Sequence, residues 1–146
     1  MTHLSSLYDQ DFYAWALQSA ELIRTGQLDR LDLEHLAEEV EDMGANKQQQ
    51  LENRLRILLS HLLKWRYQPH LRSRSWEATI KEQRYSIRRL MQKNPSLKSK
   101  WDETLTDAYY LGVLLAVRET HLEEAIFPSE CPYTTEQILS DDYWPG

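Results

Sequence analysis

The spacing of leucines between residues 51 and 65 constrains the fold more than any other feature of the chain. Apolar side chains recur there three and four positions apart, at Leu51, Leu55, Leu58, Leu59, Leu62 and Trp65. An α-helix turns about 100° per residue, so this spacing places them on one face. The chain has 23 leucines but only 6 isoleucines and 3 valines, a balance that favours helices over strands. We therefore predict a helix over about residues 45–66 in an all-α protein.

Similar patterns predict helices over about residues 10–25, 31–43, 76–92, 95–122 and 135–139. Asp9 and Ser75 are candidate N-caps, and Thr134-x-x-Gln137 is a capping box. Gly26 and Gly44 stand where the first two helices would end. The connections are short, which predicts a five-helix antiparallel bundle with a short C-terminal helix in an extended tail. We expect one domain over residues 1–146, with its core at about 8–125 and the tail at 126–146.

Composition excludes several classes of protein. No apolar run approaches the roughly 20 residues that a membrane span needs. The single cysteine, Cys131, excludes an internal disulfide and a zinc site built on cysteines. Residues 1–10 lack the basic and apolar blocks of a secretory signal. We therefore expect a cytoplasmic protein that neither enters a membrane nor carries a metal or cofactor.

The net charge of −6 conceals three blocks of opposite sign. Residues 1–46 hold 2 basic and 10 acidic side chains, residues 47–100 hold 14 and 3, and residues 101–146 hold 1 and 10. The densest basic patch is Arg84, Arg88, Arg89 and Lys93. Cations interleaved with aromatic residues suit nucleic acid, which leaves nucleic-acid binding or an acidic protein partner as alternatives. Because a bundle packs acidic helices beside basic ones, we expect most of this charge to be neutralised within the fold.

Some polar residues lie where the helical pattern calls for apolar ones. Gln83 and Glu119 fall within apolar stripes, and Glu39 and His61 fall at the borders of others. Burying a carboxylate without a partner is very costly, and the candidate partners are Arg54 and Arg84. We interpret these residues as an internal network of hydrogen bonds and ion pairs.

Two enzymatic interpretations remain open. A metal-dependent hydrolase would use Glu39, His61 and Glu119, yet the chain has no Glu-x-x-His motif of the kind found in carboxylate-bridged bundles. The nearest approach, Asp32-x-x-His35, places His35 on the acidic outer face. Arg56-x4-His61 matches the Arg-x4–6-His pattern of HEPN ribonucleases, although about one such match is expected by chance.

Several blocks of sequence resemble a known bacterial family. They are Tyr8-Asp9-x-Asp11-Phe12-x-x-Trp15, Leu36–Gly44, His61-Leu-Leu-Lys-Trp65-x-Tyr67-Gln68-Pro69, Ser75-Trp76-x-x-Thr79-Ile80-x-x-Gln83-Arg84, Asn94-Pro95-Ser96-Leu97-Lys98 and Phe127-Pro128-x-x-Cys131-Pro132-Tyr133-Thr134-x-Glu136-Gln137-Ile138-Leu139. In this order they resemble the family called domain of unknown function 29, which is abundant in cyanobacteria. The resemblance implies a small cytoplasmic helical domain from a bacterium and carries no activity. It also places Glu38 beside Glu39 in the polar network.

These observations favour a protein that acts by association. We predict an interaction or regulatory module without catalytic activity of its own. Its partner would be another protein or, as a homodimer, a second copy of the chain. The segment Tyr110–Val117, which is apolar around nearly its whole circumference, suits either the centre of the bundle or such an interface.

Overall fold

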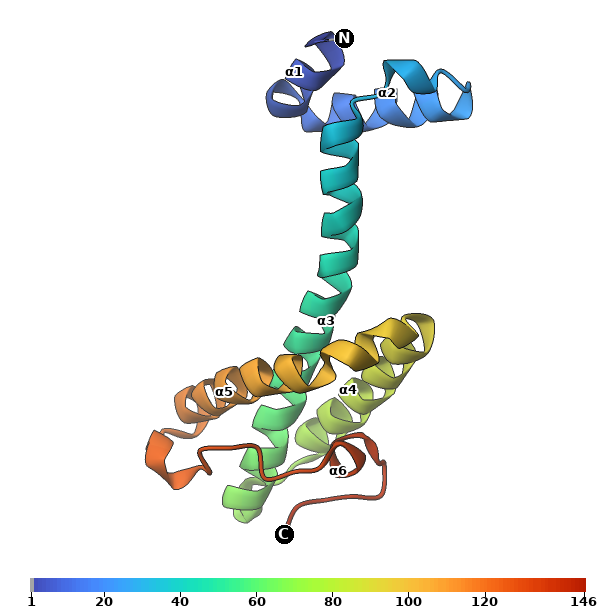
Figure 1. The fold of residues 1–146 in the computed structure, drawn as a ribbon. Helices are drawn as coiled ribbons and strands as arrows, with labels where there is room; N and C mark the ends of the chain where they lie inside the picture. The colour runs from blue at the N-terminus through green and yellow to red at the C-terminus, as the bar shows by residue number, and fades with distance from the viewer. Residues whose placement is uncertain (1) are drawn as a thin grey trace. The chain divides into compact units, whose positions relative to one another are not determined.

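The computed structural model describes residues 2–146, with side chains described from Leu4 onward. Its α-helices are α1 (Thr2–Gln10), α2 (Phe12–Arg24), α3 (Leu33–Tyr67), α4 (Arg74–Lys93), α5 (Trp101–Thr120) and α6 (Thr135–Leu139) (Figure 1). Short 3-10 helices lie between them: η1 (Leu28–Arg30), η2 (Pro69–Leu71), η3 (Pro95–Lys100) and η4 (Glu124–Ile126). No β-strand occurs in the described residues, so the predicted all-α class is confirmed.

The chain divides into two compact units. The N-terminal unit ends at Asn46, and the C-terminal unit spans Lys47–Gly146. Helix α3 contributes its first part to the N-terminal unit and its remainder to the C-terminal unit. A single domain over residues 1–146 stays a prediction of the sequence.

The helix boundary expected at Gly44 is wrong, because α3 runs through this residue without a break. A glycine that ends a helix usually adopts a positive φ, as Gly26 does at 75°, and Gly44 does not. The residues after Gly44 explain the difference. Ala45, Lys47 and three consecutive glutamines are good helix formers, and an interior glycine costs only about 1 kcal/mol relative to alanine.

Two predicted N-caps are also displaced by two residues. Asp9 lies inside α1, a helix that the pattern does not predict, and Asp11 caps α2 by accepting the Ala14 amide at 3.1 Å. Ser73, not Ser75, caps α4. Neighbouring polar residues are all able to cap a helix, and only the path of the incoming chain selects one.

Two further predictions concern the last helices. The capping box formed by Thr134 and Gln137 at the start of α6 is confirmed. The predicted helix over 95–122 is instead η3 followed by α5.

The N-terminal unit is built around one tryptophan. Trp15 of α2 is 2% exposed, and the ring of Tyr8 from α1 packs edge-on against it. Among the described side chains of this unit, only Leu4, Trp15 and Ser19 are buried. The unit therefore has a small core for its length.

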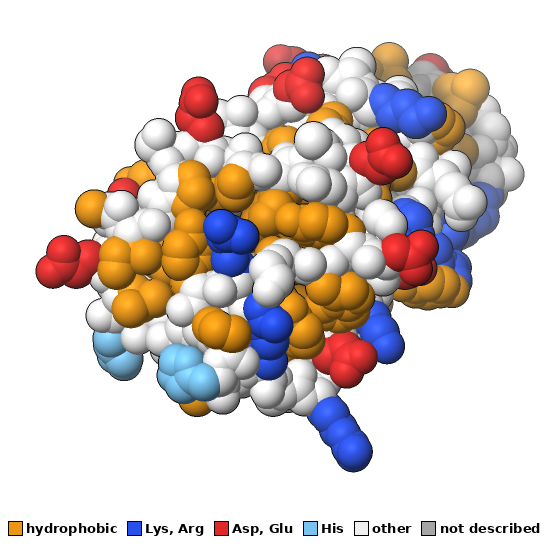
Figure 2. Space-filling model, turned by 90° about the horizontal axis from the view of Figure 1, so that it is seen from below, with side chains coloured by type: hydrophobic (Ala, Val, Ile, Leu, Met, Phe, Trp, Pro, Cys, Tyr) orange, Lys and Arg blue, Asp and Glu red, His pale blue; other side chains and the backbone are white. Residues whose placement is uncertain are grey.

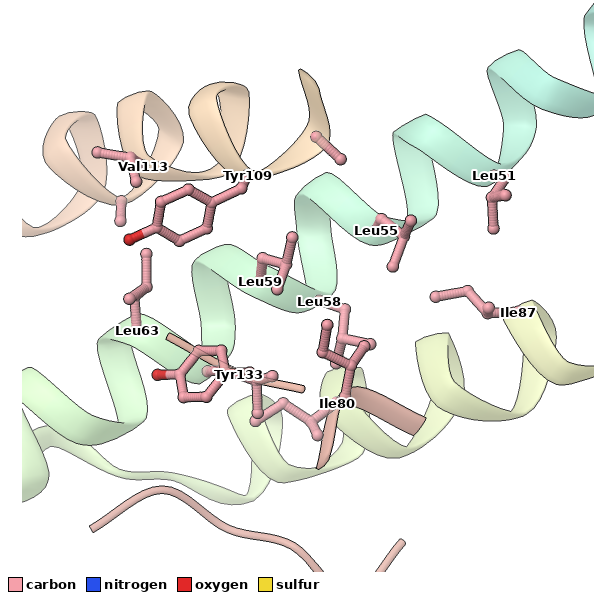
Figure 3. Close-up of a cluster of buried hydrophobic side chains, with 14 of the residues drawn as sticks. Leu51, Leu55, Leu58, Leu59, Leu63, Ile80, Ile87, Tyr109, Val113 and Tyr133 are labelled. Atoms are coloured by element: carbon pink, nitrogen blue, oxygen red, sulfur yellow. The ribbon is translucent and has the colours of Figure 1, made fainter. Parts of the chain in front are cut away.

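The C-terminal unit holds the main core, to which the second half of α3, α4 and α5 all contribute, with α5 crossing α3 obliquely (Figure 1). In Figure 3, Leu51 of α3 points toward Ile87 of α4, and Leu63 of α3 points toward Val113 of α5. Helices α3 and α5 approach closely at Gly112, where a Cβ would lie 3.1 Å from the Arg56 carbonyl oxygen. The leucines predicted for this face of α3, namely Leu51, Leu55, Leu58, Leu59 and Leu62, are all fully buried.

The C-terminal segment packs into the same core. Phe127, Tyr133 and Ile138 are buried there. The Tyr109 hydroxyl donates to the Pro128 carbonyl at 2.6 Å, and Trp101 Nε1 donates to Thr135 Oγ1 at 2.8 Å. The tail is thus bound along α4 and α5. No helix in the described part of the chain is long and apolar enough to span a bilayer.

Candidate functional site

The predicted basic patch is divided between two environments. Arg84 is fully buried, and its guanidinium donates to the Ile138 carbonyl from Nε at 2.8 Å and to the Gln137 carbonyl from Nη2 at 3.0 Å. Burial lowers the pKa of Arg84 from its ordinary value. Arg88 donates to the Leu139 carbonyl at 2.7 Å and pairs with Asp141. These two arginines bind the C-terminal tail.

The other two members of the patch, Arg89 and Lys93, line an open groove between α3 and α4. Lys47 and Arg54 of α3 line the same groove, which has a volume of about 380 Å³ and contains no acidic residue. We call it the basic groove. Arg54 donates to Gln83 Oε1 at 3.2 Å. Among the ion pairs found in the described residues, none involves any of the four cations.

Carboxylates neutralise only a minority of the positive charge within the C-terminal unit. Of the 14 cations in residues 47–100, three pair with carboxylates of residues 101–146 and one pairs with a glutamate on its own helix. Figure 2 shows one face of the molecule on which Lys and Arg side chains lie among apolar ones. The predicted neutralisation is therefore incomplete within this unit.

An ion pair between a buried lysine and an exposed glutamate occupies part of the predicted polar network, and the expectation that Glu119 is buried in an apolar stripe is wrong. Lys64 is 6% exposed and its Nζ lies 2.7 Å from Glu119 Oε1 and 4.8 Å from the centre of the Trp76 ring. Sequence analysis missed Lys64, because its spacing places it about 140° around the helix from Leu51, outside the predicted apolar stripe.

His61 belongs to this region but does not share the carboxylate. Its Nδ1 donates to the Ile57 carbonyl at 2.8 Å, within its own helix. Burial lowers the pKa of His61, which favours the neutral ring. In the described residues, no group of three or more His, Cys, Asp or Glu side chains is placed to hold a metal ion.

The third candidate catalytic residue, Glu39, belongs to the N-terminal unit and Glu38 beside it is exposed. Glu39 accepts a short hydrogen bond from the Tyr8 hydroxyl, which raises the pKa of Tyr8 to about 12. His61 and Glu119 both lie in the C-terminal unit. The hydrolase that would combine these three residues stays a prediction.

The N-terminal unit contains a polar cluster around His35, the residue that sequence analysis placed on the acidic outer face. The His35 ring stacks on Tyr8 with centroids 3.8 Å apart, and its Nδ1 lies 2.6 Å from Asp32 Oδ2. Trp15 Nε1 donates to the same carboxylate at 3.3 Å. The hydrogen bond with Asp32 raises the pKa of His35. The expectation that His35 faces outward is wrong, because α1 and α2 cover this side of α3.

The helical spacing of residues 31–43 predicts a core-facing apolar stripe of Leu33, Leu36, Ala37, Val40 and Met43, and most of it is exposed instead, with only Leu36 half-buried. Leu33, Val40 and Met43 are 65%, 54% and 62% exposed, and Ala37 between them is exposed as well. We call Leu33, Ala37, Val40 and Met43 the apolar stripe of α3. Of the 12 large hydrophobic side chains that are exposed in the described chain, eight lie in the N-terminal unit. This unit thus presents an apolar surface out of proportion to its length.

The model of the family described as "Domain of unknown function DUF29" matches residues 7–144. No curated protein and no solved structure matches the chain. The matched range covers most of each unit and contains the basic groove and the apolar stripe of α3. Because the family model spans nearly the whole sequence, the protein belongs to the DUF29 family.

Proposed function

We propose that the protein is an interaction module whose N-terminal unit binds a helix of a partner protein along the apolar stripe of α3. One observation carries this proposal. The first turns of α3 direct His35 and Glu39, together with Asp32 just before the helix, toward α1 and α2, and leave Leu33, Ala37, Val40 and Met43 exposed. A helix in a folded unit ordinarily buries its apolar side. Contiguous exposed apolar surface marks a binding site.

The spacing of the stripe suits a helical partner. Leu33 and Val40 are seven residues apart, and Ala37 and Met43 fall three or four residues from them. Such positions lie on one side of a helix and accept the i, i+3, i+4 and i+7 residues of a second amphipathic helix.

The charges beside the stripe specify the chemistry of the partner. Glu34, Glu38 and Glu41 lie along one border, about 80–140° around the helix axis from Leu33. All three are exposed. A helix with lysines or arginines beside its apolar residues would complement this border, whereas an acidic helix would be repelled.

A second copy of the chain fits this surface less well. In an antiparallel pair of α3 helices, the acidic border of one copy would meet the acidic border of the other. In a parallel pair, it would meet the side of α3 that α1 and α2 already cover. We therefore favour a basic amphipathic helix of a different protein over a homodimer.

Two synthetic helices test this proposal with the full chain. Both carry the same heptad stripe of leucines, flanked in one by lysines and in the other by glutamates. Fluorescence anisotropy should show binding of the lysine peptide and much weaker binding of the glutamate peptide. Val40→Glu should abolish binding, because it places a charge in the centre of the stripe.

Leu28→Glu provides the matched control. Leu28 is 58% exposed in the same unit but belongs to η1 and not to the stripe, so this variant should bind normally. Equal binding of the two peptides, or none, would contradict the proposal. If analytical sedimentation shows that the wild type self-associates and that Val40→Glu does not, the stripe binds a second copy of the chain instead.

A further inference from the structure

We infer that the basic groove of the C-terminal unit is a nucleotide-binding site, in which the cations bind phosphate and Tyr85 stacks on the base. The groove belongs to α3 and α4 within this unit and does not depend on the function proposed for the N-terminal unit. Nucleotide here means the chemical unit, which a free mononucleotide and a single-stranded nucleic acid share.

The first argument concerns charge. Lys47, Arg54, Arg89 and Lys93 meet in one groove although they come from distant parts of the sequence. The groove has no acidic lining residue, and none of the four forms an ion pair among the described residues. A concave surface lined by charge of one sign concentrates ions of the opposite sign. An anionic ligand is thus the expected occupant.

The second argument compares these cations with their neighbours on α4. Arg84 and Arg88 donate to backbone carbonyls of the tail, which gives them a structural role. Arg89 donates within its own helix, from Nη1 to the Tyr85 hydroxyl at 3.2 Å, and is exposed. On α4, Arg84 and Arg88 therefore hold the tail, whereas Arg89 lies at the groove and makes no hydrogen bond to the tail.

The third argument concerns Tyr85, which distinguishes a nucleotide from a simple anion. Its side chain is 55% exposed and lines the groove. The Arg89 guanidinium lies 5.7 Å from the centre of the tyrosine ring. Proteins that bind single-stranded nucleic acids combine a positively charged groove with aromatic rings on which bases stack. Tyr85 and Arg89 form such a combination.

The size and the remaining lining groups agree with this ligand class. The volume of about 380 Å³ lies at the lower end of the range of about 300–1,000 Å³ for small-molecule sites. Ser86 and Asn94 add side chains that form hydrogen bonds. An acidic peptide would satisfy the cations but would leave the exposed tyrosine ring without a stacking partner.

Binding of four probes to the full chain tests this inference. The probes are adenosine monophosphate, single-stranded oligoadenylate, inorganic phosphate and polyglutamate. We expect a nucleotide probe to bind, with affinity that falls as salt rises. If oligoadenylate binds much more tightly than adenosine monophosphate, the ligand is a single-stranded nucleic acid. If the two affinities per site are comparable, the ligand is a free nucleotide. Both results support the inference.

Three variants distinguish binding in the basic groove from non-specific attraction to the positive charge of the protein. Arg89→Ala should lower the affinity about tenfold. It should also reduce the slope of log affinity against log salt concentration by about 1, as expected for the loss of one phosphate contact. Tyr85→Leu should lower affinity about tenfold through lost stacking while leaving the net charge unchanged. Arg74→Ala is the matched control, because Arg74 is an exposed arginine at the other end of α4, outside the groove.

Several results would overturn the inference. They are the absence of binding by either nucleotide probe, polyglutamate binding as tight as oligoadenylate, and inorganic phosphate binding as tight as the monophosphate. Unchanged affinity in Tyr85→Leu, or equal losses in Arg74→Ala and Arg89→Ala, would do the same. All three substituted side chains are exposed, so circular dichroism should show that the variants keep the wild-type helix content.

Discussion

Replacing Arg84 by alanine should destabilise the C-terminal unit by about 3 kcal/mol, although Arg84 looks like one member of a surface charge patch in the sequence. The side chain is fully buried and donates two hydrogen bonds to the tail, at 2.8 and 3.0 Å. Its guanidinium also lies 5.6 Å from the centre of the Trp144 ring. Truncation removes all three interactions and leaves the Ile138 and Gln137 carbonyls without these donors.

The magnitude follows from opposing contributions. A hydrogen bond from a charged donor contributes about 1.5–3 kcal/mol, and the contact with Trp144 adds about 0.5–2 kcal/mol. Part of this is offset, because Arg84 Nη1 is buried without a partner, and an unsatisfied group of this kind costs about 1–3 kcal/mol. Truncation also removes the cost of burying the charge. The net loss of about 3 kcal/mol should lower the Tm by about 10–20 °C.

Urea unfolding followed by tryptophan fluorescence measures this loss. Four of the five tryptophans lie in the C-terminal unit, so the signal reports mainly on that unit. Arg89→Ala is the control, because Arg89 is exposed and its loss should change stability by no more than about 0.5 kcal/mol. A loss below about 1 kcal/mol in Arg84→Ala, or equal losses in the two variants, would refute the assignment of Arg84 to the tail.

Three further substitutions test the packing and the polar cluster. Leu58→Ala, at a fully buried position, should lower the free energy of unfolding by about 2–5 kcal/mol in urea denaturation. Gly112→Ala should lower it by about 1–3 kcal/mol in thermal unfolding, because the new Cβ would lie 3.1 Å from the Arg56 carbonyl oxygen, a backbone atom that does not move easily. In the N-terminal unit, the pKa of His35 is raised by its hydrogen bond with Asp32, so its stabilising effect is complete below the ordinary value of 6.5 and is lost as pH rises through the raised pKa. Burial favours a higher pKa for Asp32, but hydrogen bonds from His35 and Trp15 lower it overall, so its own contribution is lost as pH falls below 3.8. The protection of α1 amides against hydrogen exchange should therefore decrease at both ends of this pH range. His35→Gln should abolish the decrease at high pH.

The helical periodicity predicted the main core well. Leu51, Leu58 and Leu59 are buried as expected, because a long apolar stripe in the middle of a chain can pack against several later helices. The same reasoning failed for Leu33 and Val40, which form an equally regular stripe. Periodicity identifies the apolar side of a helix, but it does not identify the segment that covers this side.

The basic patch illustrates a signal that the sequence does contain. Arg84 and Arg88 are four residues apart and lie within about 40° of each other around α4, whereas Arg89 and Lys93 lie about 140–180° from Arg84. The helical spacing alone thus separates the patch into two faces. It does not reveal that the tail covers one face, or that Lys47 and Arg54 of α3 join the other.

The sequence by itself determined the all-α class, the core stripe of α3 and the capping box of α6. These features depend on backbone geometry and on residues within a few positions of each other. Only the tertiary structure decided that Arg84 serves the tail and that the polar side of α3 faces α1 and α2. Both depend on contacts between residues far apart in the chain, whose free energies outweigh local preferences of about 1 kcal/mol or less.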